Sequence, residues 1–162
     1  MNAPRRRRKK NVRILLINGP NLKLLGTREP SIYGHETLEQ IVARVKAAAA
    51  AKGVTLDAVQ SDVEGELVSA IGKARGVYDG ILINPAAYTH TSVAVRDAIA
   101  ASGLPTVEVH LSNTHKREGF RHISLTAPVC AGQVMGFGGA GYLLALDGLL
   151  HVLNAHQEKT VS

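Results

Sequence analysis

The chain contains almost none of the residues that mark secreted, membrane-spanning or base-stacking proteins. It has no tryptophan, one cysteine and only 4% aromatic residues. No apolar run approaches the roughly 18 residues that a membrane-spanning helix needs, so we expect no membrane partner. A single cysteine, Cys130, excludes an internal disulfide, which predicts a reducing compartment and a cytoplasmic protein. We assign no chemistry to this thiol.

Basic residues exceed acidic ones, but the excess is confined to the beginning of the chain. The net charge is +6, and residues 5–10 hold six of the 19 basic residues, which leaves 13 cations against 13 anions elsewhere. A nucleic-acid groove needs cations spread over a folded face, often with stacking aromatics. We therefore predict a disordered basic tail over residues 1–11 and no nucleic-acid partner. Targeting or contact with a polyanion is the weaker alternative for this tail.

The rest of the sequence alternates between strand-like and helical patterns. Short apolar runs occupy residues 12–17, 54–59, 80–83, 106–109 and about 133–136, and helical spacing occupies residues 37–53, 64–74, 92–101 and about 142–153. Thr37 and Gln40 match a capping box. Such alternation indicates a parallel sheet with helices on both faces. We predict a flavodoxin-like, doubly wound α/β fold with five strands, in a single domain over residues 12–155 that is followed by a tail at residues 156–162.

The segment over residues 18–34 differs from a plain connector. It contains two prolines and three glycines, which restrict the backbone, and it carries Asn21, Arg28 and Tyr33. It directly follows the first predicted strand, and open α/β sheets bind their ligands beyond the carboxyl ends of the strands. We interpret the segment as a functional lid, with an ordinary surface loop as the alternative.

Polar side chains gather where three predicted strands end. The first strand leads to Asn18 and Asn21, the third to Asn84 and His90, and the fourth carries Glu108, His110, Ser112 and Asn113. One histidine at such a position is more often structural. Two histidines, with Glu108 spaced to share a strand face with His110, favour acid–base chemistry instead.

Two further patterns follow the fourth strand. Lys116, Arg117 and Arg121 form a cationic cluster suited to a carboxylate or a phosphate, although a solvated turn is equally compatible with it. The glycine-rich run at residues 136–141 has the letters of a dinucleotide-binding loop. Because it follows the last strand rather than the first, close packing of the next helix is the better interpretation.

Three stretches of the sequence match the pattern of one enzyme family. They read Asn-Gly-Pro-Asn…Leu-Gly…Arg-Glu-Pro…Tyr-Gly, then Asn…Thr-His-Thr-Ser-Val…Arg-Asp, then Glu-Val-His…Ser-Asn…Arg-Glu…Phe-Arg-His, within residues 14–150. The chain thus resembles the type II 3-dehydroquinate dehydratases. The resemblance implies a flavodoxin-like subunit, a dodecamer built as four trimers, and cofactor-free dehydration of 3-dehydroquinate to 3-dehydroshikimate, a hydro-lyase step of the shikimate pathway.

The resemblance also implies roles for individual residues. Tyr33 matches the family's general base, Arg28 the residue that favours its ionised form, and His110 the general acid. Asn21 matches an asparagine that helps to stabilise the enolate, and Glu108 would orient His110. The positions that match substrate-binding residues are Asn84, His90, Leu111, Ser112, Arg121 and, reaching toward a neighbouring subunit, Asp97.

Two positions depart from the family pattern. Lys23 stands where many members have asparagine, and Ile123 stands where a second histidine often follows His122. Neither position is assigned chemistry, so the departures concern the local geometry of the loops.

Other classes of function use the same fold. A flavodoxin-like module that holds a nucleotide or a phosphate without chemistry is the main alternative, and a nucleic-acid-associated protein anchored by its tail is a weaker one. His115 and His122 lie close in sequence, but no thiol or carboxylate completes a set of ligands around them, so we predict no metal.

Overall fold

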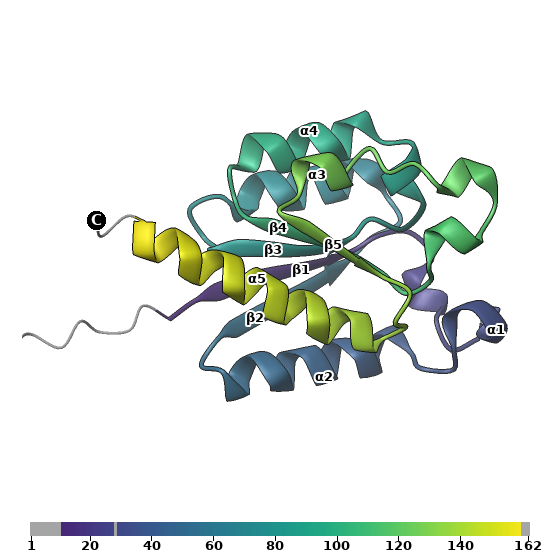
Figure 1. Cartoon of the computed structure of the whole chain (residues 1–162), viewed down its shortest axis with the longest axis horizontal. Helices are drawn as coiled ribbons and strands as arrows, with labels where there is room; N and C mark the ends of the chain where they lie inside the picture. The colour runs from purple at the N-terminus through teal and green to yellow at the C-terminus, as the bar shows by residue number, and fades with distance from the viewer. Residues whose placement is uncertain (1–10, 28, 160–162) are drawn as a thin grey trace, which may run out of the picture.

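Five parallel strands form one sheet with the order β2-β1-β3-β4-β5 (Figure 1). The strands are β1 (Arg13–Asn18), β2 (Thr55–Gln60), β3 (Gly80–Asn84), β4 (Thr106–His110) and β5 (Gly132–Met135). The computed structural model describes residues 11–27 and 29–159, with the backbone alone at residue 33 and residues 157–159. The strand order is that of a doubly wound, flavodoxin-like sheet, which confirms the predicted fold class.

Helices cover both faces of the sheet. The helices α2 (Leu38–Ala51) and α5 (Ala140–Lys159) lie on one face, and α3 (Glu64–Ala74) and α4 (Val93–Ser102) lie on the other (Figure 1). In β1, Ile14 and Leu16 belong to the core cluster under α2 and α5. Leu15 and Ile17 belong to the cluster under α3 and α4. Successive strand residues point to opposite faces, so a continuously apolar strand needs a helical layer on each side.

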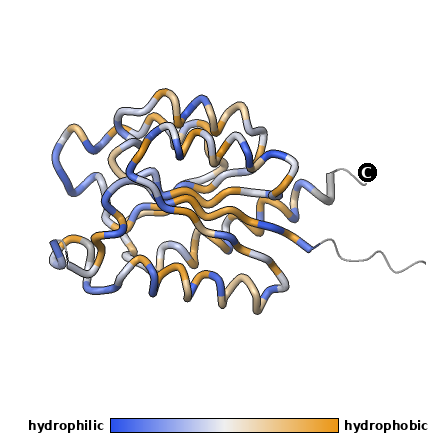
Figure 2. Tube along the Cα trace, turned by 180° about the vertical axis from the view of Figure 1, so that it is seen from behind, coloured by the Kyte–Doolittle hydropathy of each residue, from blue (hydrophilic) through white to orange (hydrophobic). Residues whose placement is uncertain are grey.

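The hydropathy of the chain follows these layers. Figure 2 shows hydrophobic residues concentrated along the central strands and hydrophilic ones along the outer sides of the helices and in the loops. Among the described helices, none is both long and apolar enough to cross a membrane.

The bounds of most elements lie close to the predicted ones. The predicted capping box starts α2: the Thr37 hydroxyl accepts the N–H of Gln40 at 3.2 Å, and the Gln40 side chain accepts the N–H of Thr37 at 3.0 Å. The last helix is longer than predicted and continues through residues 156–159, which the sequence placed in a tail. No glycine or proline lies between residues 149 and 159, so nothing in the sequence ends the helix earlier. Residues 1–10 of the predicted basic tail lie outside the described residues.

Short helices in the loops were not predicted. They are α1 (Pro30–Tyr33) and the short 3-10 helices η1 (Leu22–Leu24), η2 (Ala86–His90), η3 (Thr114–Lys116), η4 (Gly119–Arg121) and η5 (Ala127–Val129). One turn is too short to show a hydrophobic period in the sequence. Most of these turns follow the carboxyl ends of strands, so they shape the edge of the sheet where a ligand is expected.

Candidate functional site

The loops after β1 and β3 interlock at the point where the strand order reverses. Asn18 and Asn84, the last residues of these strands, are register partners. The N–H of Gly19 donates to the Asn84 carbonyl at 2.8 Å. A Cβ on Gly19 would lie 2.6 Å from the carbonyl oxygen of Pro85, so only glycine allows this approach. Doubly wound folds bind their ligands at this point.

The turn that follows β1 is held from the end of β2. Asn21 has a φ of 66°, a left-handed conformation that asparagine tolerates better than most residues. Asp62 accepts the N–H of Asn21 at 2.9 Å and also pairs with the Lys23 ammonium group. The hydrogen bond from Lys23, followed by that from Asn21, holds the pKa of the Asp62 carboxyl below its ordinary value. Lys23, which departs from the family pattern, thus supplies an ion pair that anchors this turn.

A cavity of about 110 Å³ opens between these loops and the segment after β4. Seven of the predicted site residues line it, namely Asn21, Asn84, His90, His110, Leu111, Ser112 and Arg121. Arg117 also lines this cavity, whereas Lys116 of the predicted cationic cluster is exposed and is not among its lining residues. Pockets for drug-sized ligands measure roughly 300–1,000 Å³, so this cavity suits a small molecule better than a dinucleotide.

Glu108 and His110 form a buried pair beside the cavity. Both side chains extend from the same face of β4, because they are two residues apart in a strand. The Nε2 atom of His110 lies 2.5 Å from the Glu108 carboxylate, and Glu108 has no exposed surface. The sequence therefore predicted this contact correctly. This contact through Nε2 fixes the His110 ring at the wall of the cavity, and Nδ1 is the ring nitrogen that Glu108 does not engage.

The Glu108 carboxylate receives further hydrogen bonds that the sequence analysis missed. They come from the hydroxyls of Thr89 at 2.6 Å, Thr126 at 2.6 Å and Ser124 at 3.2 Å, and from the Gln133 amide at 3.1 Å. Gln133 is the register partner of Glu108, so the pairing of the fourth and fifth strands would have revealed it. The hydroxyl donors come from loops, and no pattern in the sequence brings them together.

These donors keep Glu108 ionised despite its burial. Burial raises the pKa of the carboxyl, but the hydrogen bond and charge of His110 and the hydroxyls of Thr126 and Thr89 outweigh it and hold the pKa below its ordinary value. A buried charge is tolerated only with such partners. Glu108 therefore presents a full negative charge to His110 at neutral pH.

His90 and Arg121 are held by the loop that follows β4. The Nδ1 atom of His90 contacts the carbonyl oxygen of Ile123 at 2.7 Å. The Arg121 guanidinium donates to Glu118 at 2.9 Å and lies 5.0 Å from the centre of the Phe120 ring. Because Ile123 contributes through its backbone, its departure from the family pattern leaves this contact intact.

Three predicted site residues are not placed in the cavity. Arg28 lies outside the described residues, and only the backbone of Tyr33, at the end of α1, is described. Asp97 is exposed on α4 and is not among the described lining residues. The roles of all three remain predictions.

The remaining sequence patterns have structural explanations. The N–H of Gly138 donates to the Leu111 carbonyl at 2.9 Å, and a Cβ on Gly141 would meet the Val109 side chain at 3.5 Å, so the glycine-rich run packs the start of α5 against β4 as expected. The rings of His115 and His122 have centroids 5.9 Å apart. In the part of the chain that the structure describes, no three His, Cys, Asp or Glu side chains group as metal ligands.

Cys130 lies behind the Glu108 carboxylate. Its sulfur is 4.0 Å from the nearer carboxylate oxygen. Burial, followed by the charge of Glu108, raises the pKa of the thiol to about 12, so the thiol stays protonated and is a poor nucleophile.

Comparison with known proteins agrees with this arrangement. The family model "Dehydroquinase class II" matches residues 12–150. The chain is 56% identical to the 3-dehydroquinate dehydratase of Jannaschia sp. (strain CCS1), over 88% of this chain and 96% of the relative. The solved type II dehydroquinases of Butyrivibrio crossotus and Propionibacterium acnes are similar with TM-scores of 0.84 and 0.82, at 48% and 38% identity, each over 86% of this chain and 97% of that chain. The match of the family model and the identity to these relatives show that the chain belongs to the class II dehydroquinase family.

Proposed function

We propose that this protein dehydrates 3-dehydroquinate to 3-dehydroshikimate, with His110 as the general acid. The observation that carries the proposal is the buried Glu108–His110 pair at the wall of a small cavity. A fixed imidazole with an ionised partner is suited to moving a proton to or from a ligand. Membership of the family and the names of the relatives support this choice of substrate.

The first chemical step removes a proton beside the ketone of the substrate. The resulting enolate needs a base to take the proton and fixed donors for the negative oxygen. Tyr33 is proposed as that base, in its phenolate form. A free tyrosine has a pKa of about 10, so a nearby cation such as Arg28 is needed to favour the phenolate at neutral pH. Asn21, whose turn Asp62 anchors, supports the enolate oxygen, commonly through a water.

The second step expels the hydroxyl group. His110 gives a proton to the departing hydroxyl, the C–O bond breaks, and the electron pair of the enolate forms the new double bond, so that water leaves. Glu108 fixes the ring of His110 and provides a negative partner for the imidazolium. Glu108 does not line the cavity among the described residues and acts through His110.

The other lining residues are proposed to hold the substrate. Its carboxylate matches the positive charge of Arg121 and Arg117 on one wall. Its hydroxyl groups match the polar side chains of Asn84, His90 and Ser112, and Leu111 supplies an apolar contact. Closure of the loop that carries Arg28 and Tyr33 would then exclude water from the enolate.

Assembly completes the proposal. We propose a dodecamer built of four trimers, in which Asp97 of one subunit approaches the cavity of a neighbour. The exposed position of Asp97 on α4, apart from the cavity of its own chain, supports this role.

A spectrophotometric assay tests the function directly. The product contains a conjugated enone that absorbs ultraviolet light strongly, whereas the substrate has no conjugated double bond. We expect absorbance to rise when the folded protein is mixed with 3-dehydroquinate and to rise much more slowly with the His110→Asn variant. Folded wild-type protein that produces no enone would overturn the proposed function.

A further inference from the structure

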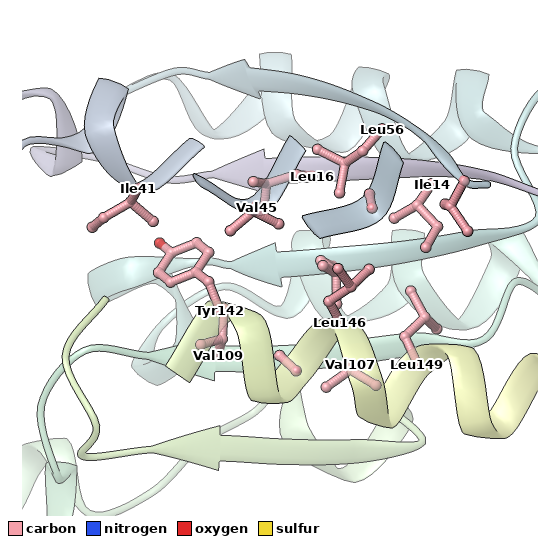
Figure 3. Close-up of a cluster of buried hydrophobic side chains, with 14 of the residues drawn as sticks. Ile14, Leu16, Ile41, Val45, Leu56, Val107, Val109, Tyr142, Leu146 and Leu149 are labelled. Carbon is pink, nitrogen blue, oxygen red and sulfur yellow. The ribbon is translucent and has the colours of Figure 1, made fainter. Parts of the chain in front are cut away.

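Tyr142 lies at the start of α5 and is completely buried. Figure 3 shows its ring among the aliphatic side chains between α5 and the sheet, near Ile41 and Val109. Most of its neighbours are apolar, yet its hydroxyl group reaches the polar ends of β1 and β3. Tyr142 is not among the described residues that line the cavity.

The hydroxyl group of Tyr142 joins two asparagines in a chain of hydrogen bonds. The Nδ2 group of Asn84 donates to the Tyr142 oxygen at 2.8 Å, and the Tyr142 O–H donates to Oδ1 of Asn18 at 2.9 Å. Burial raises the pKa of Tyr142, although the hydrogen bond from Asn84 opposes this, so the hydroxyl keeps its proton. The chain links the two strands at the point where their order reverses.

A backbone group fixes the direction of this chain. The N–H of Ala86 donates to Oδ1 of Asn84 at 3.1 Å. If the Asn84 amide were turned over, its NH₂ group would face the N–H of Ala86, and two donors would oppose each other. Ala86 also has a φ of 50°, an unusual conformation for alanine.

The orientation decides what Asn84 can offer to a ligand. Its oxygen accepts from Ala86 and one N–H donates to Tyr142, so the second N–H is the donor that remains for a ligand. Asn84 lines the cavity. The Nδ2 group of Asn18 has no hydrogen-bond partner among the described residues, so Asn18 takes part in this chain only as the acceptor for Tyr142.

We propose that Tyr142 is a positioning residue that holds the Asn84 amide with an N–H directed at the cavity, so that the site selects a ligand oxygen there. This inference rests on the proposed function, in which Asn84 binds a hydroxyl group of the substrate. It adds a determinant of specificity from α5, a helix that contributes no described residue to the cavity wall.

Kinetics of Tyr142→Phe test the proposal. The change keeps the ring and its packing and removes only the hydroxyl, so Asn84 loses one of two contacts that orient it. We expect the KM for 3-dehydroquinate to rise about tenfold, the effect of one misdirected hydrogen bond, while kcat stays within about threefold. Tyr78→Phe is the matched control, because the Tyr78 hydroxyl donates to Asp57 at 2.9 Å and neither residue lines the cavity. Its KM and kcat should stay within about twofold of wild type.

A double-mutant cycle separates positioning from general loosening of the core. If Tyr142 acts through Asn84, the double variant Asn84→Ala/Tyr142→Phe should have the same KM as the Asn84→Ala variant alone. Independent, multiplying effects on KM, or a Tyr142→Phe variant with wild-type KM, would overturn the proposal.

Two outcomes keep the test decisive. If Tyr142→Phe does not fold, Asn18→Ala is used in its place, because it removes the acceptor that holds the Tyr142 hydroxyl. The KM of this variant should then rise about threefold. An unchanged KM would overturn the proposal. Wild-type protein without dehydratase activity would instead sink the proposed function, so the two failures are distinguishable.

Discussion

At the scale of single residues, the chemistry depends on charges that are placed where water cannot reach them. Glu108 has no exposed surface, and its carboxylate makes hydrogen bonds with the side chains of Thr89, His110, Ser124, Thr126 and Gln133. An isolated carboxylate in this position would be neutral. The ring of donors therefore has a functional consequence, since only an ionised Glu108 can serve as the charged partner of His110.

Replacing Glu108 with glutamine should change how stability depends on pH. The pKa of Glu108 is lower in the folded protein than its ordinary value, so its stabilisation is present above the unfolded pKa of about 4.3 and is lost as the pH falls through the folded value. We expect Glu108→Gln to lower the free energy of unfolding by about 1–3 kcal/mol at pH 7 and by less below pH 4. Urea denaturation at both pH values measures this difference.

A surface carboxylate provides the control for this comparison. Glu39 is exposed in the first turn of α2, and Glu39→Gln should change the free energy of unfolding by about 0.5 kcal/mol or less. If the loss caused by Glu108→Gln were as large at pH 3.5 as at pH 7, Glu108 would not be ionised in the folded protein.

The identity of the base is a second prediction at this scale. Tyr33→Phe keeps the ring but removes the oxygen that takes the proton, so kcat should fall at least about a thousandfold, the upper part of general-base effects. KM should stay within a few-fold. Steady-state kinetics measure both values, with Tyr78→Phe as the control variant. If Tyr33→Phe retained more than about a tenth of the wild-type kcat while His90→Ala abolished turnover with binding intact, Tyr33 would be excluded as the base and His90 would become the better candidate.

At the scale of elements, the sequence was informative where burial is continuous and uninformative where contacts are local. The apolar runs predicted all five strands, most clearly β1, β3 and β4, in which nearly every residue is buried, because a strand covered on both faces has no polar side. The spacing of Glu108 and His110 predicted their contact for the same geometric reason. The short helices, and the hydroxyls of Thr89 and Thr126 that hold Glu108, come from separate loops whose approach depends on the whole fold.

The interlocked loops after β1 and β3 make a prediction at this scale. A Cβ on Gly19 would lie 2.6 Å from the Pro85 oxygen, so Gly19→Ala must push the two loops apart. Overpacking of this kind costs about 1–3 kcal/mol of stability. Because the loops carry Asn21 and Asn84, we expect kcat/KM to fall at least about tenfold, as misplacement of binding groups does.

A second glycine tests whether the effect is local. Gly72 lies in α3, and a Cβ added to it would meet nothing within 4 Å beyond the adjacent backbone of its own helix, so Gly72→Ala should keep kcat/KM and raise stability by up to about 1 kcal/mol. Thermal unfolding and initial rates of both variants give the comparison. Wild-type kcat/KM in Gly19→Ala would mean that the two loops do not need this close contact.

At the scale of the whole molecule, several large apolar side chains are exposed on the surface of the single chain. Both phenylalanines of the sequence are largely exposed, Phe120 at 69% and Phe137 at 62%, and Ile123 is exposed at 69%. Exposed apolar groups that lie near a site often mark contacts with other chains. Phe120 and Ile123 flank Arg121, so the loop that is proposed to hold the substrate would also be the loop that meets a neighbour.

Mixed assemblies test this arrangement through activity. If Asp97 serves the cavity of a neighbour, a His110→Asn subunit still lends its Asp97, and an Asp97→Ala subunit still has its own His110. Two variants that are each inactive alone should therefore recover about a quarter of wild-type activity when they are co-expressed in equal amounts, because a site is complete only when the right pair of subunits meets. Light scattering should give twelve copies of the 17.2 kDa chain for wild type and for the mixture. Active monomers, or an inactive mixture of correct mass, would show that each site is built from one chain. An Asp97→Ala variant that is active on its own would show that Asp97 has no part in the site.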